Sequence, residues 1–270
     1  MIRVFGGGLL CLSMCLPCVA YARDKDKPSE DDIKKAQKMV NDRLAELKAE
    51  GGGVDRITDD AVDKAFPGHI FFSVLFPQFP VGRAVPAPLK PSSIFVVSPD
   101  GKLKLLTDKK GLEDYFKSNV EPATADRAAQ DAALAWLRFT EQLAQDGLYT
   151  FKTVDEATKV EKDKDGRIAK ARGTVAKGGN GDINVSLTFD EKGKLGKVDD
   201  KSEIKPGPRP ICHATKLLDP DPLVRRIVEQ DLLIMGRAAK NYLDEQRAKA
   251  DPELRKAIDR IWQRILDEDP

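Results

Sequence analysis

Residues 125–146 of the chain read ADRAAQDAALAWLRFTEQLAQD. The centre of this stretch, residues 132–137, is apolar at consecutive positions, so a helix formed here is hydrophobic around most of its circumference. Such a helix lies inside a domain rather than on its surface. We therefore expect residues 125–146 to form a central helix that ends before Gly147, with the other elements packed around it.

The segment after the central helix has the pattern of an antiparallel sheet. Turn-forming glycines separate its extended stretches, at residues 147, 165–166, 178–181 and 192–193. Between Asp182 and Asp190 every second residue is apolar, which buries one face of a strand and leaves the other face wet. The sequence therefore predicts an α+β fold in which an antiparallel sheet packs on the central helix.

Helical and extended patterns alternate in the residues before the central helix. The expected elements are a helix at 28–50, a shorter helix at 58–65, a strand at 69–76, a hairpin at 94–106 and a short helix carrying Leu112, Tyr115 and Phe116. Ser29 and Thr58 are the expected N-caps of the first two helices. Prolines between residues 77 and 91 force an extended crossing, whose aromatic start at residues 76–80 is either a partner site or, as we favour, buried core.

The first 22 residues have the three parts of a secretory signal peptide. Arg3 supplies the charged start, residues 4–19 the apolar run, and Ala20-Tyr21-Ala22 an A-x-A cleavage site ahead of a polar segment. A membrane anchor is the alternative, but the run is short for a spanning helix. We expect an exported protein, periplasmic or secreted, without a membrane span after signal removal.

The positions of the four cysteines predict that the exported protein has no intramolecular disulfide. Cys11, Cys15 and Cys18 lie in the leader, and the residues before them differ from the small residues typical of a lipoprotein site. Cys212 is then the single cysteine of the mature chain, so no intramolecular disulfide can form and the core alone must hold the fold. Cys212 is a reactive thiol, half of an intermolecular bridge or, as we favour, a small buried hydrophobe.

Charge is balanced along the chain. Removal of Arg3 with the leader leaves 44 of the 45 basic residues against 44 acidic residues. Proteins that bind nucleic acid or anionic membranes need a concentrated basic face. Because charges of both signs are interleaved throughout, as on a solvated surface, we expect no nucleic-acid partner.

The chain is expected to be helical from Pro222 to its end, after an extended proline-rich linker at 205–210. The predicted helices are 222–235, 237–250 and 252–266. The pattern Leu232-x-x-x-Gly236-x-x-Ala239-x-x-x-Leu243, preceded by Asp221 and Arg225 and followed by Pro252-Glu253-x-Arg255, resembles a HEAT-type αα-hairpin, of the kind found in exported planctomycete proteins of unknown function.

The HEAT resemblance implies an architecture and assigns no catalytic residue. A helical solenoid needs about three units to bury its own core, whereas this chain has one hairpin and one further helix. The hairpin must therefore pack on the α+β domain or on a protein partner. The expected division is a signal peptide at 1–22, an α+β domain at 23–205 and a HEAT-like helical extension at 206–270.

A second resemblance concerns residues 30–204. Two helices, strands, a helix after a Gly-Lys-Leu hairpin and a long antiparallel meander are similar in order to cystatin-like and NTF2-like folds. This resemblance implies a fold alone, because such folds carry many unrelated functions.

Few residues of the chain are of the types that form nucleophilic or metal-binding sites. His69 and His213 are the only histidines, and Cys212 is adjacent to His213. The three would supply the residue types of a metal site or of a Cys-His nucleophile pair, but they lack the close spacing that such sites usually show. Asp219 and Asp221 are better explained as helix caps than as paired catalytic acids. We therefore assign no catalytic, metal-binding or cofactor-binding residue.

Two hypotheses about function follow. The first is a non-catalytic, exported binding or envelope-associated module that contacts a protein partner through the C-terminal helices. The second is an NTF2-like small-ligand binder or enzyme with a pocket between the sheet and the central helix, where polar groups such as His69 converge. The second hypothesis requires that Trp136, Phe139 and Leu143 leave this space open.

Overall fold

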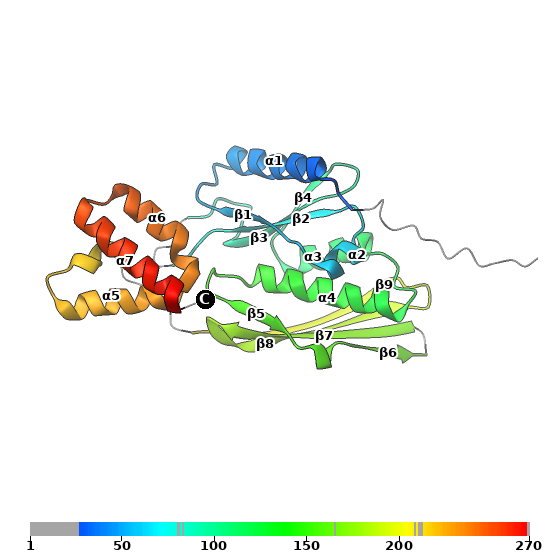
Figure 1. Cartoon of the computed structure of the whole chain (residues 1–270). Helices are drawn as coiled ribbons and strands as arrows, with labels where there is room; N and C mark the ends of the chain where they lie inside the picture. Colours follow the sequence, from blue (N-terminus) through cyan, green and yellow to red (C-terminus); the bar gives the residue numbers. More distant parts are fainter. Residues whose placement is uncertain are drawn as a thin grey trace, which may run out of the picture.

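The computed structural model describes residues 27–79, 82, 84–164, 166–207, 209 and 213–268. The described part is built from antiparallel sheets and helices in layers, followed by a group of C-terminal helices (Figure 1). It confirms the predicted α+β fold class. The leader at 1–22 and Cys212 lie outside the described residues.

Sheet A is a four-stranded antiparallel meander in the order of the chain. Its strands are β1 (Gly53–Arg56), β2 (Ile70–Leu75), β3 (Ser92–Val97) and β4 (Leu103–Leu106). Helix α1 (Glu30–Glu46) lies across one face, where Val40 and Leu44 pack with Phe72 and Phe95 (Figure 1). Ser29 caps α1 through a reciprocal pair of bonds with Asp32, as its sequence position predicts.

Three helices separate sheet A from a second sheet. They are α2 (Asp60–Ala65), α3 (Lys109–Asn119) and α4 (Asp126–Leu143), and α4 is the predicted central helix. Sheet B below them contains β5 (Thr150–Thr153), β6 (Lys159–Asp163), β7 (Gly166–Lys177), β8 (Gly179–Asp190) and β9 (Leu195–Pro206). Its order is β5-β7-β8-β9, and β6 also pairs with β7. The layers are therefore α1, sheet A, helices α2–α4 and sheet B (Figure 1).

The position of α4 explains its apolar circumference. Phe139 packs against Phe71 of sheet A, with ring centroids 4.6 Å apart. On the opposite side, buried Ala169, Val185 and Leu187 of sheet B belong to the same hydrophobic core. A helix that contacts a sheet on both sides needs apolar residues on both sides.

The C-terminal helices have a hydrophobic core of their own. They are η2 (Ala214–Leu218), α5 (Pro222–Met235), η3 (Gly236–Ala239), α6 (Lys240–Lys249) and α7 (Pro252–Glu268). This core is built around Val228, Leu232 and Ile258, and Leu148 of the α+β part packs against it. Asp221 and Asp251 cap α5 and α7 by accepting bonds from Leu223 N and Leu254 N.

Several elements differ from the sequence-based expectations. Sheet A is a sheet of its own, distinct from the sheet predicted after the central helix, and its strand β1 was not among the expected elements. The N-cap of α2 is Asp59 rather than Thr58, because the Asp59 carboxylate reaches the amides of Ala61 and Val62. The expected linker begins two residues later, at Gly207, since β9 continues through Pro206, which pairs with Gly179.

Candidate functional site

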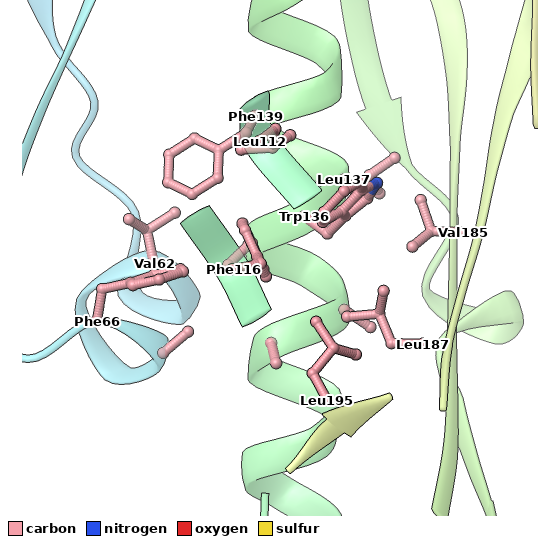
Figure 2. Close-up of a cluster of buried hydrophobic side chains, with 14 of the residues drawn as sticks. Val62, Phe66, Leu112, Phe116, Trp136, Leu137, Phe139, Val185, Leu187 and Leu195 are labelled. Carbon is pink, nitrogen blue, oxygen red and sulfur yellow. The ribbon is translucent and has the colours of Figure 1, made fainter. Parts of the chain in front are cut away.

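The space between α4 and sheet B is filled by side chains. Trp136 and Leu137 are each 1% exposed and occupy this space. Phe139 is fully buried on the other side of α4, against Phe71 of sheet A, and Leu143 packs against the same core. Figure 2 shows Trp136 and Leu137 directed toward Val185 and Leu187, with Phe66 and Phe116 on the other side of the helix. The pocket required by the ligand-binding hypothesis would have to occupy this packed region.

A buried carboxylate, Asp200, joins β9 to the helices. Its oxygens accept hydrogen bonds from Trp136 Nε1 at 2.8 Å, from Thr140 Oγ1 at 3.0 Å and from Lys109 Nζ at 2.7 Å. Ser202 Oγ donates a further bond at 3.1 Å. Four donors from three elements satisfy the buried carboxylate. We interpret Asp200 as a structural link between β9, α3 and α4.

Glu141 carries a second buried carboxyl group, and few hydrogen bonds or charges offset the cost of its burial. Its side chain is 5% exposed, and Arg138 is close to it, with Nη1 3.3 Å from Oε2. Among the described residues, Oε1 has no hydrogen-bond partner. Burial raises the pKa of Glu141 to about 7, and Arg138 opposes this effect.

Gly173 of β7 makes room for Glu141. A Cβ atom at position 173 would lie 2.7 Å from Glu141 Oε1 and 3.1 Å from Leu137 Cδ1. The carboxyl is therefore packed closely between α4 and β7.

His69 lies in an aromatic cluster at the start of β2. Its ring contacts Phe66, Phe71 and Tyr115 at centroid distances of 5.7 to 6.2 Å, and Nδ1 is 3.0 Å from Pro67 O. Burial lowers the pKa of His69. The adjoining cavity, lined in part by Asp63, has a volume of about 70 Å³, far below the volume of a typical ligand site. His69 is best explained as a packed core residue.

A larger surface groove of about 590 Å³ runs between α1 and the β3–β4 turn. Ala36, Met39 and Ile70 line part of it. Its charged lining is mixed: Lys27 and Lys35 are cationic, whereas Asp32 is anionic and already bonded to Ser29. These charges do not define one class of ligand.

The exposed apolar surface is concentrated in the C-terminal helices. Within the described residues, the exposed large hydrophobic side chains fall between 218 and 234: Leu218 is 42% exposed, Leu223 61%, Ile227 41% and Ile234 54%. The last three recur at helical spacing on one face of α5, together with the exposed Gln230. We call Leu223, Ile227, Gln230 and Ile234 the α5 stripe. The opposite face of α5 is buried through Val228, Leu232 and Met235.

The residues considered for metal or nucleophile chemistry do not form a site in the described part of the chain. His213 is exposed at the N-cap of η2 in the C-terminal helices, whereas His69 packs against Phe66 at the end of α2. Cys212 is not among the described residues. Within these ranges, no group of three or more His, Cys, Asp or Glu side chains is placed to hold a metal ion.

Comparison of the chain with protein-family models, curated proteins and solved structures gave no match. Within the described ranges, no helix is both long and apolar enough to span a membrane. The functional argument therefore depends on the geometry of the chain itself.

The α5 stripe was not identified as a site from the sequence. Its signal was present, because residues 223–235 carry apolar positions on two faces of one helix. Sequence alone does not reveal which face the neighbouring helices cover.

Proposed function

We propose that this protein is an exported, non-catalytic binding module that contacts a protein partner through the α5 stripe. The observation that carries the proposal is the concentration of exposed large hydrophobic side chains between residues 218 and 234. Exposed apolar clusters that are rimmed by polar residues mark interaction surfaces.

The charges around the stripe favour a protein over a lipid surface. Arg225 and Arg226 follow Leu223, whereas Glu229 and Asp231 flank Gln230. A helix that binds anionic lipids carries an excess of Lys and Arg on its polar face. The balanced charges of α5 lack this excess, and they suit a partner whose surface carries both signs.

The HEAT-like resemblance supports the same proposal. In a helical solenoid each hairpin buries its faces against neighbouring units. Here α7 and η2 cover the inner face of α5, and its outer face carries the exposed stripe. A partner helix would complete the packing that a further repeat supplies in a solenoid.

Export is proposed from the leader pattern of residues 1–22. Mass spectrometry of the protein recovered from the envelope and the medium tests this part. We expect a mature N-terminus at Arg23. Recovery of the intact Met1 form in the cytoplasm would contradict export.

The partner surface can be tested by site-specific photocrosslinking in the native envelope. A photoreactive residue at Ile227 or Ile234 should give discrete cross-linked species. The same residue at Arg260, on the exposed surface of α7, is the matched control and should give none. Equal cross-linking at all three positions, or no cross-linking at 227 and 234, would overturn the proposal. It would also be overturned if the purified protein catalysed a reaction and a conservative substitution of one residue abolished that activity.

The alternative function, an NTF2-like small-ligand binder or enzyme, needs a pocket between the sheet and the central helix. Trp136 and Leu137 pack in this region toward Val185 and Leu187, whereas Phe139 packs toward sheet A and Leu143 joins the same core. No described feature therefore favours the alternative over the binding module.

A further inference from the structure

The α5 stripe has the spacing of a short helix-pairing seam. Its members, residues 223, 227, 230 and 234, are separated by four, three and four positions. This alternation places side chains along one line that faces a partner helix, as a and d positions do in coiled coils. Because the stripe is nearly symmetric about its midpoint between residues 228 and 229, it also matches its own reversed copy.

We infer that the α5 stripe pairs with the same stripe of a second copy of this chain, in antiparallel orientation about a two-fold axis. The inference rests on the proposed function, because it takes the stripe to be a docking surface. In such an isologous contact Leu223 faces Ile234 of the second copy, and Ile227 faces its Gln230. Each apolar residue of the stripe is then covered.

The charges on α5 complement themselves in this orientation. Arg226 and Glu229 lie on the same flank of the stripe, toward its N-terminal and C-terminal halves respectively. Antiparallel two-fold pairing brings like flanks together, so Arg226 of each copy approaches Glu229 of the other, twice per dimer. Glu229 already contacts Arg264 of its own chain at 3.4 Å, which leaves it able to accept a second cation.

Gln230 favours a second copy over an unrelated apolar helix. It is exposed in the middle of the stripe. In the antiparallel pair the two Gln230 residues lie on either side of the two-fold axis, about 4.5 Å apart along the helix direction, so their amides can bond to each other. An apolar partner helix would bury the same amide without a hydrogen bond, which is unfavourable.

The position of α5 permits this pairing. Figure 1 places α5 at the outer edge of the C-terminal helices, with its N-terminal end away from the sheets. Antiparallel pairing then directs the two α+β parts to opposite ends of the dimer. The contact is small, so we expect weak association with a dissociation constant of about 10–500 µM.

Analytical ultracentrifugation of the purified mature protein tests self-association. Wild-type protein should shift from monomer to dimer as its concentration rises to about 1 mM, consistent with a weak interface. Ile227→Asp should weaken association at least about 30-fold by burying an unpaired charge. Arg260→Asp, which changes the charge on the exposed surface of α7, is the control and should leave it unchanged.

A charge exchange tests the self-complementary flank. Arg226→Glu and Glu229→Arg should each weaken self-association about 10-fold, because each creates two like-charge contacts. A mixture of the two variants should associate within about 3-fold of wild type, since both contacts become attractive again. Failure of the mixture to recover, with both variants folded, would overturn the antiparallel arrangement.

Cysteine cross-linking tests the orientation, in a Cys212→Ser background. Leu223→Cys and Ile234→Cys proteins should form a mixed 223–234 disulfide far faster than either forms a homodimer. Preferred 223–223 bonds would overturn the antiparallel pairing. A wild-type protein that stays monomeric to about 1 mM overturns the second-copy inference. If photocrosslinks at Ile227 then reach a different protein, the proposed function still stands.

Discussion

At the residue scale, Trp136 combines two roles that can be separated. Its ring packs at 4.8 Å centroid distance from Phe116, and its Nε1 donates to the buried Asp200. Trp136→Ala is expected to lower the free energy of unfolding by about 3–5 kcal/mol, as large core truncations do. Urea unfolding measures this change, and a loss below about 1 kcal/mol would mean that α4 is not central to stability.

Trp136→Phe is the matched variant. It keeps an aromatic ring but leaves Asp200 without one donor, so we expect a smaller loss of about 1–3 kcal/mol. Equal losses for the two variants would show that ring packing contributes nothing beyond the hydrogen bond.

Glu141 predicts a pH dependence of stability. Its pKa is about 7 in the folded protein and about 4.5 in an ordinary environment, so the folded state holds the proton more tightly than the unfolded state. The resulting stabilisation is fully present below pH 4.5 and is lost as the pH rises through about 7. The total change is about 3 kcal/mol.

The Glu141 prediction can be checked by urea unfolding of the wild type and Glu141→Gln at pH 5 and pH 8. The glutamine variant removes the titrating group, so it should be more stable than wild type at pH 8 and show less change between the two values. Glu50→Gln, at an exposed position, should follow the wild type. A wild-type profile shared by Glu141→Gln would contradict the prediction.

At the element scale, Arg209 holds the segment between β9 and η2 against the α+β part of the chain through several bonds. Its side chain is 10% exposed and contacts Asp146 at 2.5 Å, Gly178 O at 2.6 Å and Gly207 O at 3.2 Å. The guanidinium also lies 4.8 Å from the Tyr149 ring centroid. These bonds tie the connection to the end of α4 and to the β7–β8 turn.

Arg209→Ala is expected to destabilise this junction by about 2–4 kcal/mol, because it leaves the half-buried Asp146 without its cation. Limited proteolysis should show faster cleavage between β9 and η2, alongside lower stability in urea. Arg264→Ala removes an exposed arginine that also makes ion pairs and should cost less than about 1 kcal/mol. Equal sensitivity of the two variants would argue against a fastening role for Arg209.

Local sequence signals predicted most elements because they act within a few residues. Ser29 and Asp32 specify the start of α1, and alternation along residues 182–190 specifies β8. Strand β1 has only four residues, of which Val54 is the one large apolar residue, so its sequence lacks the apolar–polar alternation that marks a strand. It forms because β2 offers a partner, which is a long-range condition.

At the scale of the whole molecule, sequence patterns did not reveal the second sheet or the exposed face of α5. The apolar circumference of residues 132–137 predicts burial, but it does not distinguish one covering sheet from two. Asp200 was missed for the same reason: its partners Trp136, Thr140 and Lys109 are 60 to 91 residues away in the chain. The α5 stripe depends on where η2 and α7 pack.

The placement of α4 between two sheets also sets an order of events during synthesis. Sheet A can pair its own strands as soon as residue 106 has emerged, because its meander is local. Its lower face, with Phe71 and Val96, is covered in part by Phe66 after α2, but the cover is complete only when residues 126–143 follow. A chain delivered from its N-terminus therefore carries a partly uncovered apolar sheet for an interval, and during that interval it depends most on protection from aggregation.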